Sequence, residues 1–180
     1  MLAFGTATRI ALTPVVMALI LIGDESQDPL AAVLFCIAAA TDWIDGRLAR
    51  RWNVTTRLGS FLDTTADKLL VAGVLIALLG DARVSPWIVA VIVGRELVLM
   101  GLRGVLAAAD GEVMPPSQLG KLKTSIQFLA IALAILRPWD TVGGQYVDEW
   151  VMLVAAAITV WSAADYIVRA IPTLTSDFRT

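Results

Sequence analysis

The sequence predicts an all-α fold, an integral membrane bundle of six transmembrane helices that forms one domain over residues 1–180. Hydrophobic residues make up 58% of the chain and charged residues only 17%. This is more apolar surface than a soluble domain of this size buries. The apolar residues also gather in six runs, several of them close to the ~20 residues that cross a bilayer as a helix.

Helix-breaking residues separate these runs and place each element in turn. We expect helices at about residues 7–23, 29–46, 65–80, 86–108, 119–137 and 148–170. The helix breakers at their ends or in the segments between them are Gly23, Pro29, Gly80, Pro86, Pro115, Pro116, Pro138, Gly143 and Gly144. The first run contains Arg9 and lacks a cleavage site of small residues, so we interpret it as a retained helix. The third run is short unless its polar start, from Phe61, is included.

The basic residues predict the orientation of the bundle. Of the 14 lysines and arginines, only Arg83 and Arg137 fall in the loops at the end opposite the termini, where acidic residues such as Asp24 and Asp81 gather instead. Basic loops stay in the cytoplasm. We therefore expect cytoplasmic termini and a multi-pass protein of the cell (inner or plasma) membrane.

Composition excludes several kinds of chemistry. The net charge is −2, so no overall basic field favours nucleic acid as a partner. The chain has no histidine, which removes the usual zinc ligand and the usual general base. Its one cysteine, Cys36, cannot form an intrachain disulfide. A metal site in this chain must use oxygen ligands, which favours Mg²⁺, Mn²⁺ or Ca²⁺.

Four aspartates form two pairs around the loop between the second and third helices. Asp42 and Asp45 are spaced i, i+3, and Asp63 and Asp67 are spaced i, i+4. Both spacings place the two carboxylates of a pair on one helical face. Four carboxylates that converge near lipid repel one another unless cations neutralise them. We therefore expect two divalent cations here, the arrangement that phosphoryl displacement uses.

Neighbouring residues fit a nucleotide diphosphate beside these carboxylates. Gly46 and Gly59 let a ligand approach a helix backbone closely, and Ala49 keeps the same face small. Arg50 lies one turn beyond Gly46 and can bind phosphate oxygens with its planar guanidinium.

Two other interpretations of the aspartates remain open from the residues alone. They could be helix caps or part of a solvated face, with Asp63 as an N-terminal cap before Thr64. They could also line a divalent-cation transport path. A transporter, however, is expected to place acidic residues near the membrane midplane, whereas these lie at one face.

The whole set reads D-x2-D-G-x2-A-R-x8-G-x3-D-x3-D and resembles the signature of the CDP-alcohol phosphotransferase family at every position. The resemblance implies six transmembrane helices, a homodimer, and transfer of a phosphatidyl group from CDP-diacylglycerol to an alcohol, with CMP leaving. It implies that two Mg²⁺ or Mn²⁺ ions are bound by Asp42, Asp45, Asp63 and Asp67, with Asp67 also the general base. The CDP moiety would be held by Gly46, Ala49, Arg50 and Gly59.

Two further segments, Gly94–Gly104 and Leu119–Gln127, resemble bacterial members of the family whose acceptor is glycerol 3-phosphate. This implies that the acceptor phosphate is bound by four cations, Arg95, Arg103, Lys121 and Lys123. Glu96 either orients one of the arginines in a buried pair or offsets their charge. Inositol phosphate, phosphatidylglycerol and serine are the alternative acceptors, and inositol phosphate fits the basic residues equally well.

The N-terminal segment departs from a pattern that is common in the family. Thr6, Arg9 and Ile10 match it, whereas Leu2, Ala3 and Gly5 do not. We therefore leave Thr6 and Arg9 out of the expected site.

Overall fold

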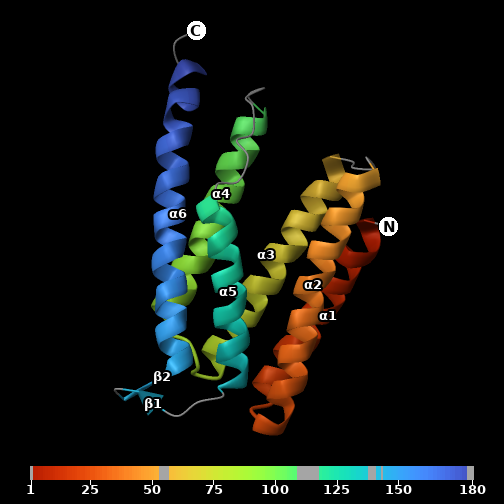
Figure 1. Ribbon diagram of the computed structural model, residues 1–180, viewed down its shortest axis with the longest axis vertical. Helices are drawn as coiled ribbons and strands as arrows, with labels where there is room; N and C mark the ends of the chain where they lie inside the picture. Colours follow the sequence, from red (N-terminus) through yellow and green to blue (C-terminus); the bar gives the residue numbers. More distant parts are fainter. Residues whose placement is uncertain (1, 53–56, 109–117, 138–140, 143, 178–180) are drawn as a thin grey trace.

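The computed structural model describes residues 2–52, 57–108, 118–137, 141–142 and 144–177. Within these ranges, only the backbone of residues 2–4, 42–52, 57–58, 60, 107–108, 118–119, 121 and 172–177 is described. Six α-helices account for most of the described residues (Figure 1). They are α1 (Leu2–Leu21), α2 (Asp28–Trp52), α3 (Arg57–Gly80), α4 (Pro86–Ala108), α5 (Gln118–Leu136) and α6 (Val147–Asp177). The expected all-α fold and its six helices are confirmed.

Some boundaries differ from the expected ones. Helix α3 begins at Arg57, ahead of the expected residue 65, because its polar first turns continue the helix that the apolar run starts. A short 3₁₀-helix, η1 (Glu25–Gln27), precedes α2. An antiparallel ribbon of β1 (Thr141–Val142) and β2 (Gln145–Tyr146) joins α5 to α6. This ribbon, which was not predicted from the sequence, turns at Gly144 with φ +83°.

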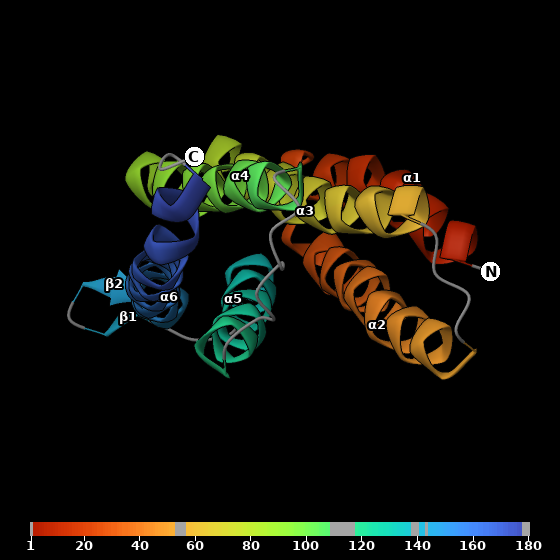
Figure 2. The same cartoon turned by 90° about the horizontal axis from the view of Figure 1, so that it is seen from above.

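The helices run along the long axis of the molecule, and the chain ends lie toward the same end of the bundle (Figure 1). We call this the terminal end: α1, α3 and α5 begin toward it, and α2, α4 and α6 end toward it. The opposite, loop end holds η1, the turn at residues 81–85 and the β-ribbon. Seen from above, α4, α3 and α1 form one layer and α6, α5 and α2 the other (Figure 2).

One hydrophobic core joins all six helices. Its fully buried side chains include one or more from each of them, such as Val16, Phe35, Leu75, Ile92, Ile131 and Met152. Helices α1 and α3 lie close together at Gly73, where an added Cβ would lie 2.8 Å from a side-chain carbon of Thr13 and 2.9 Å from the sulfur of Met17. Glycine at this position therefore sets the distance between two helices that carry site residues.

A buried arginine joins three elements at the loop end. Arg83 donates hydrogen bonds to the carboxylates of Asp28, at 2.7 Å, and Asp81, at 2.5 Å, and to the carbonyl of Ile135, at 2.6 Å. Burial alone would lower the pKa of Arg83, but the two carboxylates outweigh it and raise the pKa above its usual value. The charged guanidinium therefore holds α2, the α3–α4 turn and α5 together, away from the aspartate pairs.

Within the described residues, one helical segment, Val147–Ile171 of α6, is apolar and long enough to cross a membrane. Gly5–Leu21 and Leu122–Leu136 are apolar but shorter. Every 18-residue stretch of α4 contains Arg95, Glu96 and Arg103, which lower its hydropathy. These charged residues, which the sequence places in the candidate site, thus lower the mean hydropathy of the helix that carries them. The six-span membrane bundle remains a prediction.

Candidate active site

The second aspartate pair lies on one face of α3, as its spacing predicts. Asp63 and Asp67 are one helical turn apart, and both side chains are mostly buried, with 25% and 18% of their surface exposed. Each carboxylate uses one oxygen for a contact with a neighbouring cation. The structure thus places two partly buried carboxylates near the start of a helix, where they face protein groups as well as solvent.

Asp63 is held by two residues of α1. Arg9, whose side chain is 0% exposed, donates to Asp63 Oδ1 at 2.5 Å and to the Asp63 carbonyl at 3.2 Å. Thr6 Oγ1 donates to the same carboxylate oxygen at 3.3 Å. Sequence reasoning left both residues out, and their match to the family's N-terminal pattern was the signal that could have included them. The contact spans 54 residues of chain, so spacing along one helix could not predict it.

A second group of charges surrounds Glu96 of α4. Lys68 Nζ lies 2.6 Å from Glu96 Oε2, Arg95 Nη1 lies 2.8 Å from Oε1, and Lys123 of α5 donates to Oε1 as well. We call Lys68, Arg95, Glu96 and Lys123 the Glu96 cluster. Lys68 also donates to Asp67 Oδ2 at 3.1 Å, so the cluster is directly connected to the aspartate pair.

The Glu96 cluster carries more positive than negative charge. Three cations surround one carboxylate, and the side chains of Glu96 and Lys123 are only 6% and 3% exposed. Buried charges are stable only when they are paired, so an excess of cations favours an anionic ligand. The cluster brings together Arg95 and Lys123, two of the four residues expected to bind the acceptor phosphate. The position of Lys68 in it was missed because Glu96, one of its two partners, lies on another helix.

Arg103, the other predicted acceptor residue whose side chain is described, lies against α6. Its Cζ is 5.0 Å from the centre of the Tyr166 ring. Arg95 reaches the same helix, since its Nη2 donates to Ser162 Oγ at 3.0 Å. Neither Ser162 nor Tyr166 was among the residues predicted from the sequence.

Several predicted site residues have side chains that lie outside the described part of the structure. They are Asp42, Asp45, Gly46, Ala49 and Arg50 in the last turns of α2, and Lys121 in the first turn of α5. Gly59 lies in the first turn of α3. The end of α2 and the start of α3 lie at the same, terminal end of the bundle (Figure 1).

The described carboxylates fit the expected cations by the chemistry of their oxygens. Within the described ranges no three acidic, cysteine or histidine side chains form a metal cluster. The contacts of the Asp63 carboxylate fall on Oδ1 and that of Asp67 on Oδ2. Among the described residues, no hydrogen bond or ion pair is made by Asp63 Oδ2 or Asp67 Oδ1. One oxygen of each therefore remains for a hard cation such as Mg²⁺ or Mn²⁺.

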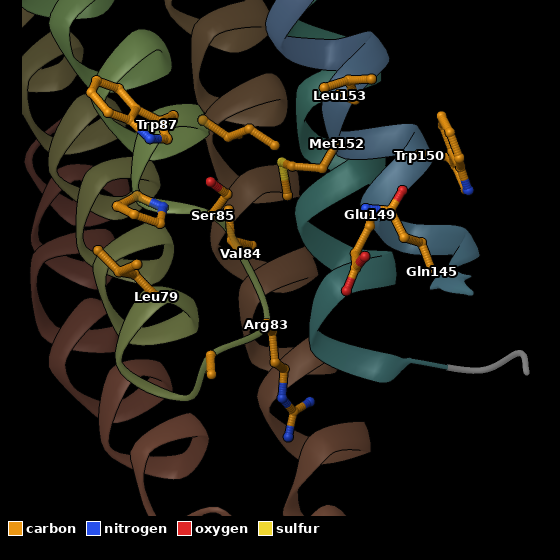
Figure 3. A pocket seen from close by; sticks show the side chains of 13 residues that line it. Leu79, Arg83, Val84, Ser85, Trp87, Gln145, Glu149, Trp150, Met152 and Leu153 are labelled. Carbon is orange, nitrogen blue, oxygen red and sulfur yellow. The ribbon is translucent and has the colours of Figure 1, made fainter. Parts of the chain in front are cut away.

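A cavity of about 630 Å³ lies elsewhere, at the loop end (Figure 3). It is lined mainly by apolar side chains from the α3–α4 turn, α4 and α6, including Trp87, Trp150 and Met152. Glu149 also lines it, and its carboxylate lies 3.5 Å from Arg137. None of the predicted site residues lines this cavity, so we do not assign the chemistry to it.

Comparison with known proteins gives a family and several relatives. A family model described as CDP-alcohol phosphatidyltransferase matches residues 4–161. The CDP-diacylglycerol–glycerol-3-phosphate 3-phosphatidyltransferase of Bacillus subtilis is 40% identical over 173 residues, covering 87% of this chain and 89% of the relative. The protein of the same name from Salmonella choleraesuis is 36% identical, covering 92% and 91%. That from Escherichia coli K12 is 40% identical, covering 78% of each chain.

Proposed function

Since the chain belongs to the CDP-alcohol phosphatidyltransferase family, we propose that it transfers a phosphatidyl group from CDP-diacylglycerol to glycerol 3-phosphate. The products are phosphatidylglycerol phosphate and CMP, which makes the chain a phosphatidylglycerophosphate synthase. The names of the relatives support these substrates. The Glu96 cluster is the structural observation that favours a phosphorylated acceptor.

The acceptor phosphate fits the excess of cations in this cluster. Arg95 and Lys123, together with Arg103 and Lys121, would bind a phosphate dianion, and Glu96 would hold the first two in place. A neutral acceptor such as serine gives no reason for three cations to gather around one buried carboxylate. Inositol phosphate carries the same charge, and the relatives' names favour glycerol 3-phosphate over it.

Asp67 is suited to take the proton of the acceptor hydroxyl. Lys68 donates to its Oδ2 at 3.1 Å, so Oδ1 would serve both as a cation ligand and as the acceptor of the hydroxyl proton. Lys68 also contacts Glu96, at 2.6 Å. The same side chain thus links the proposed base to the proposed phosphate site, so that an acceptor bound by its phosphate has its hydroxyl near a carboxylate.

The donor side of the site rests on the aspartates and the small residues around them. Asp42, Asp45, Asp63 and Asp67 would hold two Mg²⁺ or Mn²⁺ ions, which when bound neutralise the diphosphate and the departing CMP. Arg9 and Thr6 orient Asp63 from α1. The CDP moiety would lie along Gly46, Ala49, Arg50 and Gly59.

The outer surface supports a membrane location. Large apolar side chains are exposed along the helices, among them Val33, Ile76, Val98, Trp161 and Val168, whose exposed fractions are 54%, 52%, 60%, 70% and 66%. Soluble proteins rarely expose apolar surface on this scale.

We infer one membrane domain with six spans, a homodimer in the cell membrane, and termini and active site at the cytoplasmic face. A reporter fused to the C-terminus should be cytoplasmic, and an external reporter would refute this orientation.

Release of CMP by the purified full chain tests the reaction. With CDP-diacylglycerol and Mg²⁺ or Mn²⁺, we expect release with glycerol 3-phosphate and none after chelation. Asp67→Asn should abolish turnover but keep metal-dependent binding of CDP-diacylglycerol. Release with inositol phosphate alone would keep the reaction class and refute the acceptor. Release that persists after chelation would refute the role of the cations.

A further inference from the structure

Helix α6 contacts the two arginines of α4, Arg95 and Arg103, that we assign to the acceptor phosphate. Ser162 accepts a hydrogen bond from Arg95 Nη2 at 3.0 Å, and the Tyr166 ring lies 5.0 Å from Arg103 Cζ. Ser162 and Tyr166 are four residues apart, so they lie on one face of α6. Helices α4 and α6 lie side by side in both views (Figures 1 and 2).

Both α6 residues are buried and cannot easily move. Ser162 is 3% exposed and Tyr166 is 4% exposed. The Tyr166 ring packs in a small hydrophobic cluster with Leu99 and Leu106 of α4 and Ala170 of α6. A side chain fixed by packing in this way can restrict the rotamers of a long arginine that lies against it.

Each arginine still has a buried donor to offer. In the described part of the chain, the Nε atoms of Arg95 and Arg103 are buried and have no hydrogen-bond partner. Buried polar atoms in proteins are almost always paired. A bound anion would supply an acceptor for these donors, which packing against apolar side chains cannot do.

We propose that Ser162 and Tyr166 are positioning residues, which hold the guanidinium groups of Arg95 and Arg103 in the orientation that binds the acceptor's phosphate. The inference rests on the proposed function and extends it from α4 and α5 to α6. Ser162 acts through a charged hydrogen bond, and Tyr166 acts through the face of its ring. Both effects lower the entropy that each arginine loses when the phosphate binds.

Kinetics of single variants separate positioning from general damage. Ser162→Ala should raise the KM for glycerol 3-phosphate by up to about tenfold, the factor expected when one long side chain has to be ordered on binding. Tyr166→Leu should raise it about fivefold. The KM for CDP-diacylglycerol should stay within about twofold in both. Ser162→Thr, which keeps the hydroxyl, and Tyr166→Phe, which keeps the ring, should each recover most of the lost affinity.

Thr159 is the matched control, since it is a buried α6 residue whose hydroxyl has no described partner. Thr159→Val should leave both KM values unchanged. Equal rises in both KM values, or failure of the conservative variants to recover affinity, would overturn the inference. So would a Thr159→Val effect as large as that of Ser162→Ala.

A binding measurement keeps this test independent of the acceptor's identity. Inorganic phosphate should stabilise the detergent-purified protein against heat, and Ser162→Ala should raise the half-saturating concentration about tenfold. If the unaltered protein uses another phosphorylated acceptor, this shift still supports the inference while the proposed substrate fails. No phosphate-dependent stabilisation, or the same half-saturating concentration in the variant, would overturn the inference even if glycerol 3-phosphate proves to be the substrate.

Discussion

Replacing Glu96 by glutamine should strongly destabilise the bundle. The carboxylate is 6% exposed, contacts Lys68 at 2.6 Å and Arg95 at 2.8 Å, and accepts a hydrogen bond from Lys123. Glutamine has nearly the same shape but leaves Arg95 and Lys123 without this counter-charge, and Lys68 with Asp67 alone. Breaking a buried ion pair in this way costs about 3–5 kcal/mol. Because the amide oxygen can still accept one hydrogen bond, we expect a loss of about 3 kcal/mol.

Equilibrium unfolding of the full chain in detergent micelles measures this loss. The control is Asp165→Asn on α6, which removes the carboxylate of an exposed i, i+4 pair with Arg169. These two side chains are 32% and 41% exposed, so the control should cost no more than about 0.5 kcal/mol. Losses of equal size, both below about 1 kcal/mol, would refute the view that the Glu96 cluster is buried and charged.

A double variant identifies the cause of the loss. If uncompensated positive charge is responsible, adding Lys123→Met to Glu96→Gln removes one of the cations that lost its partner. The two substitutions together should then cost less than the sum of their separate effects. Additive costs would show that Glu96 and Lys123 stabilise the protein independently, contrary to their contact in the structure.

Two further substitutions test how α1 is joined to the site helix α3. Gly73→Ala should lower the free energy of unfolding by about 1–3 kcal/mol, because its new methyl would lie 2.9 Å from the sulfur of Met17. The control is Gly101→Ala, which should be neutral or stabilising because no atom lies within 4 Å of the added carbon. Equal effects of the two substitutions would contradict the close approach at Gly73. Arg9→Lys keeps the charge but loses the planar guanidinium that reaches both the carboxylate and the carbonyl of Asp63. It should lower the free energy of unfolding by about 2 kcal/mol and also lower the rate of CMP release. Unchanged values of both would refute the role of the guanidinium.

The helices were largely predictable because their signals are local. Apolar runs and helix breakers placed α4 at residues 86–108, and the structure has it at Pro86–Ala108. The start of α3 was placed too late because its first turns are polar, and a helix end that carries functional carboxylates does not look apolar. The β-ribbon was missed because two-residue strands carry almost no sequence signal.

The candidate site was only partly predictable. Spacing along α3 placed Asp63 and Asp67 on one face, and the resemblance implied that Arg95 and Lys123 share a site. The partners Arg9, Lys68 and Ser162 were not found, and neither was the position of Arg103 against Tyr166. Their contacts join different helices, so no local pattern in the sequence predicts which side chain meets which.

The sequence by itself determined the helices, the spacing of the carboxylates and the family, since each depends on residues close together in the chain or on their order along it. Only the tertiary structure decided that α1 supplies Arg9 to Asp63, that Glu96 gathers cations from three helices, and that α6 supports the two arginines of α4. The physical reason is that helical periodicity sets which residues share a face, whereas the packing of distant apolar side chains sets which faces meet.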